Sequence, residues 1–257
     1  MRGPLIPILA SVGVLALAAF LLYERPSRDQ GASLALACAA GMKAPVEAIV
    51  RAYRDETGVA VNVQYGGSGT LLSGLEIARQ GDLFLAADNS YIDLAKEAGL
   101  VNESFALARM RPVIAVAKGN PKGVHETADL LREDLRAALA SPEAASIGKV
   151  SERLFEAAGQ WEAVRAAVTA RGVFKPTVND VANDVKIGAM DAAVIWDAVA
   201  KQYPELDTVP LEGSEAFIET VTVGVLTFSE QPDAARRFAA YMAAPDKGGA
   251  VFASMGY

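Results

Sequence analysis

The repeated alternation of short apolar runs with amphipathic segments is the feature that most constrains how this chain folds. Residues 34–40 form one apolar run, and the segment 45–57 then carries apolar side chains three or four residues apart before a glycine at position 58. This spacing predicts a strand followed by a helix that ends at a glycine. Repeated along the chain, it predicts an α/β fold with parallel sheets covered by helices on both faces.

The same pattern continues to the C-terminus. Further strands are predicted at residues 59–65, 83–86, 112–117, 137–140, 192–196 and 219–228, and further helices at 71–79, 90–98, 151–158, 161–170 and 232–243. Because 52% of the 257 residues are hydrophobic, the chain can bury one large core or two smaller ones. We expect two lobes with a ligand cleft where strand ends and helix starts face each other.

The N-terminal segment is apolar without interruption from Pro4 to Tyr23. About 20 residues are enough to cross a bilayer as a helix. Residues 24–31 are polar and contain proline and glycine, which predicts a tether. We predict an uncleaved membrane-anchor helix. A cleaved signal peptide is the alternative, with the small residues around Ala16 and Ala18 as the candidate cleavage site.

The charge balance restricts the class of partner. The chain has 24 basic and 31 acidic residues, a net charge of -7, and no block of lysine and arginine. Nucleic acid is therefore a poor candidate, because phosphate backbones are bound mainly by clustered cations. A small anion remains compatible, since a few oriented N–H and O–H groups can bind it whatever the net charge.

The single cysteine and the single histidine exclude several kinds of site. Cys38 alone cannot form an intrachain disulfide or a cysteine-cluster metal site, and we interpret it as a buried strand residue rather than a lipidation site. His125 lies in a polar stretch and is interpreted as a solvated loop or cap residue. With one histidine, the usual Ser-His and Zn-His arrangements cannot be built, and we predict no enzymatic activity.

Two groups of carboxylates invite a functional interpretation. Asp82, Asp88 and Asp93 are spread over a predicted strand end, a turn and a helix, so turn or cap roles are favoured over a cation site. Asp191 and Asp197 bracket a buried strand and are favoured as its polar ends rather than as an acid/base pair.

A glycine-rich turn carries the most specific chemistry. Residues 65–71 read Tyr-Gly-Gly-Ser-Gly-Thr-Leu, between a predicted strand and a predicted helix. Glycine lets the backbone approach a ligand, Ser68 offers a hydroxyl, and the first helical turn has free N–H groups, which together suit an oxyanion. The alternative is that Ser68 only caps its own helix. A second turn at 39–43 places Gly41 and Met42 toward the same cleft, with Lys43 either adding charge or solvated.

These turns are part of a longer resemblance. The Ala-Ala-Gly-Met turn at 39–42, the Gly-Gly-Ser-Gly-Thr-Leu turn at 66–71, the segment 81–88 and the segment 191–198 resemble the periplasmic molybdate-binding proteins of ABC transporters. The resemblance spans about residues 33 to 257. It implies a two-lobed type II periplasmic-binding-protein fold, with residues 32–110 and 211–257 in lobe 1, residues 111–210 in lobe 2, and residues 1–31 as anchor and tether.

In that family the anion is bound without countercharge by hydroxyls, backbone N–H groups and a tyrosine. Ser68 matches one serine position, while the other serine position falls on Gly41 and the tyrosine position on Trp196, which can donate only through its indole N–H. Backbone donors are expected near Ile147 and Val178. The ligand-binding set implied by the resemblance is Gly41, Met42, Ser68, Gly69, Ile147, Val178, Asn179 and Trp196.

The resemblance implies a solute-binding protein without a cofactor. Its ligand is molybdate or tungstate, its partners are an ABC permease and ATPase, and it works at the periplasmic or extracytoplasmic face of the membrane. Three alternatives remain. They are another oxyanion such as sulfate or phosphate, a membrane-anchored sensor without transport, and an enzyme carrying a cysteine-linked cofactor, for which Cys38 is the only attachment point.

Overall fold

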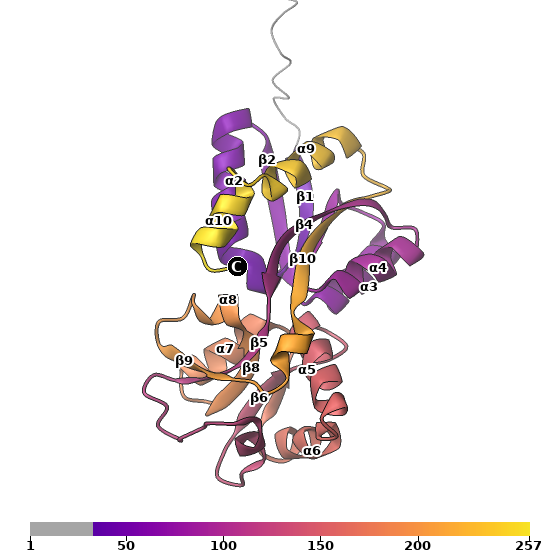
Figure 1. Ribbon diagram of the computed structural model, residues 1–257. Helices are drawn as coiled ribbons and strands as arrows, with labels where there is room; N and C mark the ends of the chain where they lie inside the picture. The colour runs from indigo at the N-terminus through magenta and orange to yellow at the C-terminus, as the bar shows by residue number, and fades with distance from the viewer. Residues whose placement is uncertain (1–32) are drawn as a thin grey trace, which may run out of the picture.

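The computed structural model describes residues 33–257, and two five-stranded sheets organise this part of the chain into two lobes (Figure 1). The first sheet has the order β2-β1-β3-β10-β4 and the second the order β7-β6-β8-β5-β9. The strands of the first sheet are β1 Ser33–Ala39, β2 Ala60–Gly66, β3 Leu83–Ala86, β4 Val101–Met110 and β10 Glu219–Leu226. Those of the second are β5 Pro112–Ala117, β6 Ala137–Ala140, β7 Val173–Lys175, β8 Ala192–Trp196 and β9 Leu206–Pro210.

Helices cover both faces of the first sheet. On one face α3 (Ser68–Ala78) and α4 (Asn89–Glu97) pack on a core that includes Phe84. On the other face lie α2 (Lys43–Thr57), α9 (Pro232–Ala243) and α10 (Gly248–Ser254) (Figure 1). A short 3-10 helix, η1 (Ala40–Met42), joins β1 to α2. The predicted α/β lobe is confirmed.

The second lobe is built in the same way. Its helices are α5 (Ser146–Ala157), α6 (Trp161–Arg171), α7 (Val178–Lys186) and α8 (Asp197–Ala200), with 3-10 helices η2 (Thr127–Leu131) and η3 (Ser214–Phe217). Strand β6 runs parallel to β7 and β8, while β5 runs antiparallel to β8 and β9. The β8 strand is fully buried along its length.

The prediction of parallel sheets is wrong in one respect, because both sheets are mixed. In the first, β10 pairs antiparallel with β3 and with β4. The reason is the route of the chain: β10 is reached from the second lobe rather than through a helix that crosses over from a neighbouring strand. Only strands joined by such crossovers must run parallel.

The chain crosses between the lobes twice, once at Arg111 between β4 and β5 and once between β9 and β10. Figure 1 shows β4 and β10 side by side, with β4 running toward the lower lobe and β10 running back from it. Arg111 is held at the crossing by Asp197, whose carboxylate accepts the Arg111 backbone N–H at 3.2 Å. That each lobe is a separate folding unit with the bounds given above stays a prediction.

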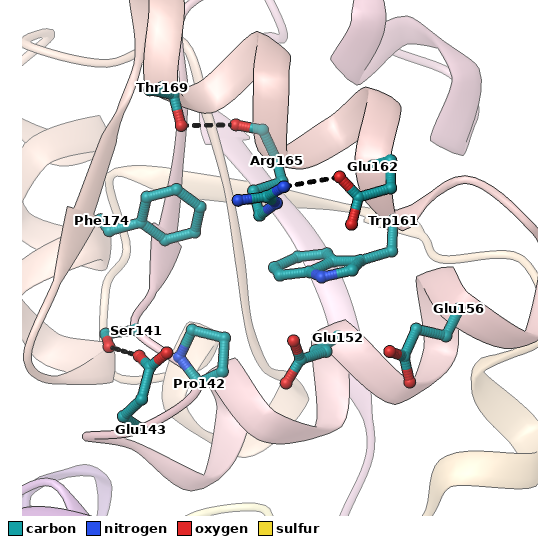
Figure 2. Close-up of a pocket in the computed structure, with 10 residues that line it drawn as sticks. All are labelled: Ser141, Pro142, Glu143, Glu152, Glu156, Trp161, Glu162, Arg165, Thr169 and Phe174. Atoms are coloured by element: carbon teal, nitrogen blue, oxygen red, sulfur yellow. Dashed lines mark hydrogen bonds and ion pairs between the residues drawn. The ribbon is translucent and has the colours of Figure 1, made fainter.

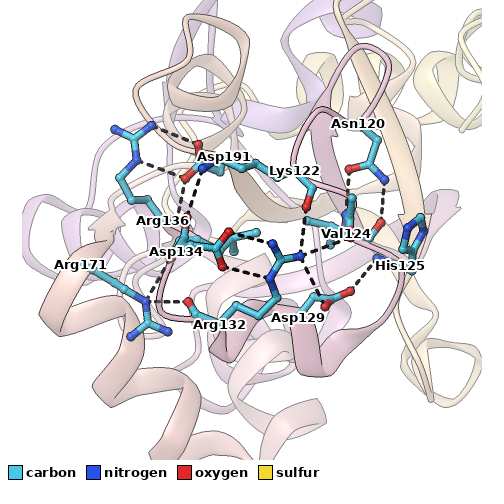
Figure 3. A network of polar contacts seen from close by, with 12 residues as sticks. Asn120, Lys122, Val124, His125, Asp129, Arg132, Asp134, Arg136, Arg171 and Asp191 are labelled. Carbon is cyan, nitrogen blue, oxygen red and sulfur yellow. Dashed lines mark hydrogen bonds and ion pairs between the residues drawn. The ribbon is translucent and has the colours of Figure 1, made fainter.

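The isolated cysteine and histidine have the positions predicted for them. Cys38 is 0% exposed near the end of β1, which confirms a buried strand residue and removes the attachment point of a cysteine-linked cofactor. His125 is exposed, and its backbone N–H donates to Asp129 at 2.7 Å within the polar network of the second lobe (Figure 3). In the same network Arg132 pairs with Asp134 at 2.8 Å. This network fixes the loops before β6.

The predicted anchor and tether, residues 1–31, lie outside the described part of the chain. Between residues 33 and 257, no helix is long and apolar enough to cross a membrane.

Candidate functional site

Four helical segments begin around one small cavity between the lobes. From the first lobe come the starts of η1 and α3, and from the second lobe the starts of α5 and α7. The cavity is lined by Ala39, Ala40, Gly41, Gly66, Gly67, Ser68, Ala87, Ala145, Ser146, Ile147, Thr177, Val178 and Trp196. The two glycine-containing turns that the sequence singled out are thus brought together.

The cavity has the electrostatics of a small-anion site. The first N–H groups of a helix have no carbonyl in the same helix to bond, and they carry the positive end of the helix dipole. Residues at these helix starts line the space, whereas none of the described residues that line it is charged. Such an arrangement can bind an anion through oriented dipoles without a cation.

Ser68 lies at the centre of this arrangement. Its side chain is 1% exposed, and its Oγ accepts the Ala87 backbone N–H at 3.3 Å and bonds to the Ser146 hydroxyl at 2.8 Å. The N-cap of α3 is Gly67, which makes no side-chain capping bond, and Ser68 is the first residue of the helix. The alternative that Ser68 only caps its own helix is therefore wrong.

A side chain at Gly41 would be crowded by two valines. A Cβ atom added at Gly41 would lie 3.1 Å from side-chain carbons of both Val178 and Val199. The Gly41 carbonyl accepts a hydrogen bond from the Tyr257 hydroxyl at 2.5 Å, which holds the turn in place. Its neighbour Met42 is 0% exposed in the core and does not line the cavity.

Three predicted residues of the second lobe, Ile147, Val178 and Trp196, line the cavity, whereas Gly69 and Asn179 do not. Gly69 donates its N–H to the Ala144 carbonyl at 3.0 Å, a bond between the lobes. Asn179 turns its Nδ2 to the Tyr203 hydroxyl at 3.2 Å. Their part in binding stays a prediction, as does that of Met42.

Sequence reasoning missed Ser146 and Thr177. Ser146 precedes the predicted donor Ile147 directly, but the helix was expected to begin at residue 151, so no special role was given to residue 146. Thr177 caps α7 by accepting the Asp180 N–H at 3.2 Å, and its hydroxyl donates to the Asp180 carboxylate at 2.6 Å. A hydroxyl residue directly before a helix is the signal that points to such a cap, but no helix was predicted after Thr177.

The charged groups singled out in the sequence have structural roles. Lys43 is exposed and lies 4.0 Å from Glu47, away from the cavity. Asp82 accepts the Ala35 N–H at 2.8 Å, and Asp88 caps α4 by accepting the Ser90 N–H at 2.8 Å. In the described part of the chain, no group of three His, Cys, Asp or Glu side chains is placed to hold a metal ion.

A larger cavity of about 600 Å³ lies within the second lobe, between α5 and α6 (Figure 2). It is lined by Glu143, Glu152, Glu156 and Glu162 around the rings of Trp161 and Phe174. The single arginine, Arg165, is paired with Glu162 at 2.6 Å. The carboxylates repel an anion, so despite its size this cavity is not the anion site.

Replacing Glu152 with glutamine is expected to stabilise the protein at neutral pH. Burial raises the pKa of Glu152, and the charges of Glu156 and Glu143 raise it further. A raised carboxyl pKa means that the ionised form is disfavoured in the folded state, so stability falls as pH rises through that pKa. Glu152→Gln should raise the unfolding midpoint at pH 7 by about 1 to 2 °C. Below pH 4, where both states carry a neutral carboxyl group, the difference should vanish. A lower midpoint at pH 7 contradicts this account.

Comparison with known proteins identifies the family. Residues 34–257 match the family described as bacterial extracellular solute-binding protein. The chain belongs to this family. It is a family of substrate-binding proteins rather than of enzymes, and the match covers nearly all of the part that the structure describes.

Individual relatives agree with this assignment. A Haemophilus influenzae protein, named only as a binding protein, is 31% identical over 218 residues, which cover 84% of this chain and 87% of that protein. The molybdate-binding protein ModA of Mycobacterium bovis is 29% identical over 191 residues, covering 73% of this chain and 69% of that protein. These similarities confirm the resemblance to molybdate-binding proteins of ABC transporters.

Solved structures share the fold with little sequence identity. The periplasmic molybdate-binding protein of Azotobacter vinelandii has a TM-score of 0.74 at 19% identity, covering 87% of this chain and 98% of that one. The sulfate-binding protein SubI of Mycobacterium tuberculosis has a TM-score of 0.72 at 18% identity, covering 88% and 86%. Because the same fold carries different ligands, the ligand has to be argued from the site.

Proposed function

We propose that this chain binds molybdate or tungstate in the cavity between its lobes and delivers the anion to an ABC importer. The observation that carries the proposal is the convergence of four helix starts and the Ser68 hydroxyl on a space lined by uncharged residues. Molybdate and tungstate are tetrahedral dianions without a proton at neutral pH, so a set of donors suffices to bind them. The relatives named as molybdate-binding support this ligand class.

The lining residues also distinguish between oxyanions. Hydrogen phosphate carries a proton that needs an acceptor, and no carboxylate lines the described cavity. Sulfate is fully deprotonated, as molybdate is, and differs from it mainly in its smaller size. Sulfate is therefore the second candidate, and phosphate the weakest of the four anions.

The two lobes suggest how binding is coupled to delivery. Donors from both lobes reach a bound anion only when the lobes are close, so the anion shifts the population toward the closed form. The closed form then docks on a membrane permease with its ATPase. An N-terminal anchor at residues 4–23 would keep the protein near that permease and raise its effective concentration.

Thermal unfolding of the full chain in detergent tests the ligand. Molybdate and tungstate should each raise the midpoint, because a ligand that binds only the folded state stabilises it. Ser68→Ala should remove about 1.5 to 3 kcal/mol of that stabilisation, the contribution of a hydrogen bond to a charged group. A higher midpoint with sulfate alone would identify sulfate as the ligand instead. An unchanged midpoint with all of molybdate, tungstate, sulfate and phosphate would overturn the proposal.

A further inference from the structure

The Ser68 and Ser146 hydroxyls face each other across the boundary between the lobes. Ser68 begins α3 in the first lobe and Ser146 begins α5 in the second, and their Oγ atoms are 2.8 Å apart. Both side chains are almost fully buried, with 1% and 3% exposed. Both line the cavity.

The hydrogen-bonding capacity of this pair is only partly used. Each serine hydroxyl has one proton to donate, and the bond between the two oxygens uses one of the two protons. The Ala87 N–H donates to Ser68 and so adds no acceptor. Among the described residues, no acceptor is recorded for the second proton. A buried donor without an acceptor is costly and points to a group that supplies one.

Among the described residues that line the cavity, no other side-chain hydroxyl is available in this way. Thr177 donates its proton to Asp180 at 2.6 Å. Position 41 carries no hydroxyl, and a Cβ atom there would lie 3.1 Å from side-chain carbons of Val178 and Val199. The second hydroxyl that can reach an anion in this cavity therefore comes from the second lobe, at Ser146.

The small size of the cavity indicates that a contact across it must open when the anion binds. The free space is about 10 Å³, roughly enough for one water molecule. An oxyanion with four oxygens needs more, so some contact across the cavity has to open. The hydroxyl pair is one contact that can open, since a single hydrogen bond joins it and both side chains can turn toward a ligand about their torsions.

We propose that Ser146 donates its hydroxyl to the bound oxyanion from the second lobe, and that the anion replaces the Ser68–Ser146 hydrogen bond when it binds. This inference rests on the proposed function and names a further specificity residue of the same site. It gives each lobe one side-chain hydroxyl on the ligand. The anion then joins the lobes through two O–H donors, of which only the Ser146 hydroxyl has an acceptor without it.

Calorimetric titration of the full chain in detergent with sodium molybdate tests this role. Ser146→Ala should weaken binding about tenfold, which corresponds to the loss of one hydrogen bond to the anion. The matched control is Ser151→Ala. Ser151 is equally buried in the same helix, but its hydroxyl donates to the Ile147 carbonyl at 2.6 Å and does not line the cavity. Ser151→Ala should change the affinity less than twofold.

Two further measurements separate a ligand donor from a structural contact. If each serine bonds the anion, the double variant Ser68→Ala, Ser146→Ala should lose roughly the product of the two single losses in affinity. If the serines serve only each other, the double variant should be no worse than either single one. Unfolding without ligand gives the second readout, because a merely structural contact lowers the ligand-free midpoint as much as the molybdate-bound one.

The outcomes distinguish this inference from the proposed function. If the wild type binds molybdate and Ser146→Ala binds it with the same affinity, the role of Ser146 is overturned and the proposed function stands. A wild type that binds none of molybdate, tungstate, sulfate and phosphate overturns both.

Discussion

Gly69→Ala is expected to weaken molybdate binding about 100-fold or more, a cost of roughly 3 kcal/mol. A Cβ atom at position 69 would lie 2.2 Å from the Glu143 carbonyl oxygen and 3.2 Å from that of Ala144, both in the opposite lobe. The two lobes would have to separate to relieve this overlap, which pulls the α5 and α7 donors away from the anion. Calorimetric titration with molybdate measures the loss.

Gly74→Ala is the matched control, since it makes the same change in the same helix. A Cβ atom at Gly74 meets nothing within 4 Å. This variant should bind molybdate as the wild type does and gain a little stability, because alanine favours helix over glycine by about 1 kcal/mol. Small-angle scattering should show Gly69→Ala as more open than Gly74→Ala. Equal affinities for the two variants would show that close contact between the lobes at Gly69 is not needed for binding.

The close approach at Gly69 would also allow the proposed uncharged site to hold a dianion. In water, a dianion is surrounded by many donors, and a protein replaces them only by bringing several oriented N–H and O–H groups to one point. No single helix start can do so. The lobes meet through glycines at 67 and 69, where any side chain would strike carbonyl oxygens of the other lobe, and this lets helix starts from both lobes converge.

Much of the fold could be predicted because the buried strands have a simple pattern. The continuous apolar runs of β1, β3, β5 and β8 are short and uninterrupted, so their type was clear from the sequence alone. In contrast, β4 was missed. Its ten residues mix exposed and buried side chains without regular alternation, because β4 is an edge strand of the sheet and continues into the other lobe.

The parts of the site that could be predicted from the sequence are its backbone turns. The turns at Gly41 and Ser68 were found, and they meet at the cavity, because glycine and a hydroxyl residue between a strand and a helix are a local signal. Ser146 was not found. Glycine at 148 lowers the helix propensity of the first turn of α5, so the predicted helix began at residue 151 rather than at Ser146. That glycine is required by packing, since a Cβ there would lie 2.4 Å from the Ser141 carbonyl oxygen.

Trp196→Ala is expected to lower the free energy of unfolding by about 3 to 5 kcal/mol. Trp196 is 1% exposed and is the largest of the fully buried side chains in the described part of the chain. It ends β8, where it pairs with Pro112 of β5, and its ring lies beside Gly41 at the cavity. Its removal leaves a large void between the second sheet and the first lobe. Urea unfolding of the ligand-free protein measures the loss.

Two further variants separate the volume of the Trp196 ring from its indole N–H. Trp161→Ala removes the same side chain at the rim of the acidic cavity, where it is 8% exposed, and should cost less, about 1 to 3 kcal/mol. Trp196→Phe keeps most of the ring volume and should recover most of the stability. If the indole N–H also bonds the anion, Trp196→Phe should still bind molybdate about tenfold more weakly than the wild type. Because stability and affinity then change independently, an affinity equal to that of the wild type assigns Trp196 to packing alone and leaves the hydroxyls and helix starts as the donors of the site.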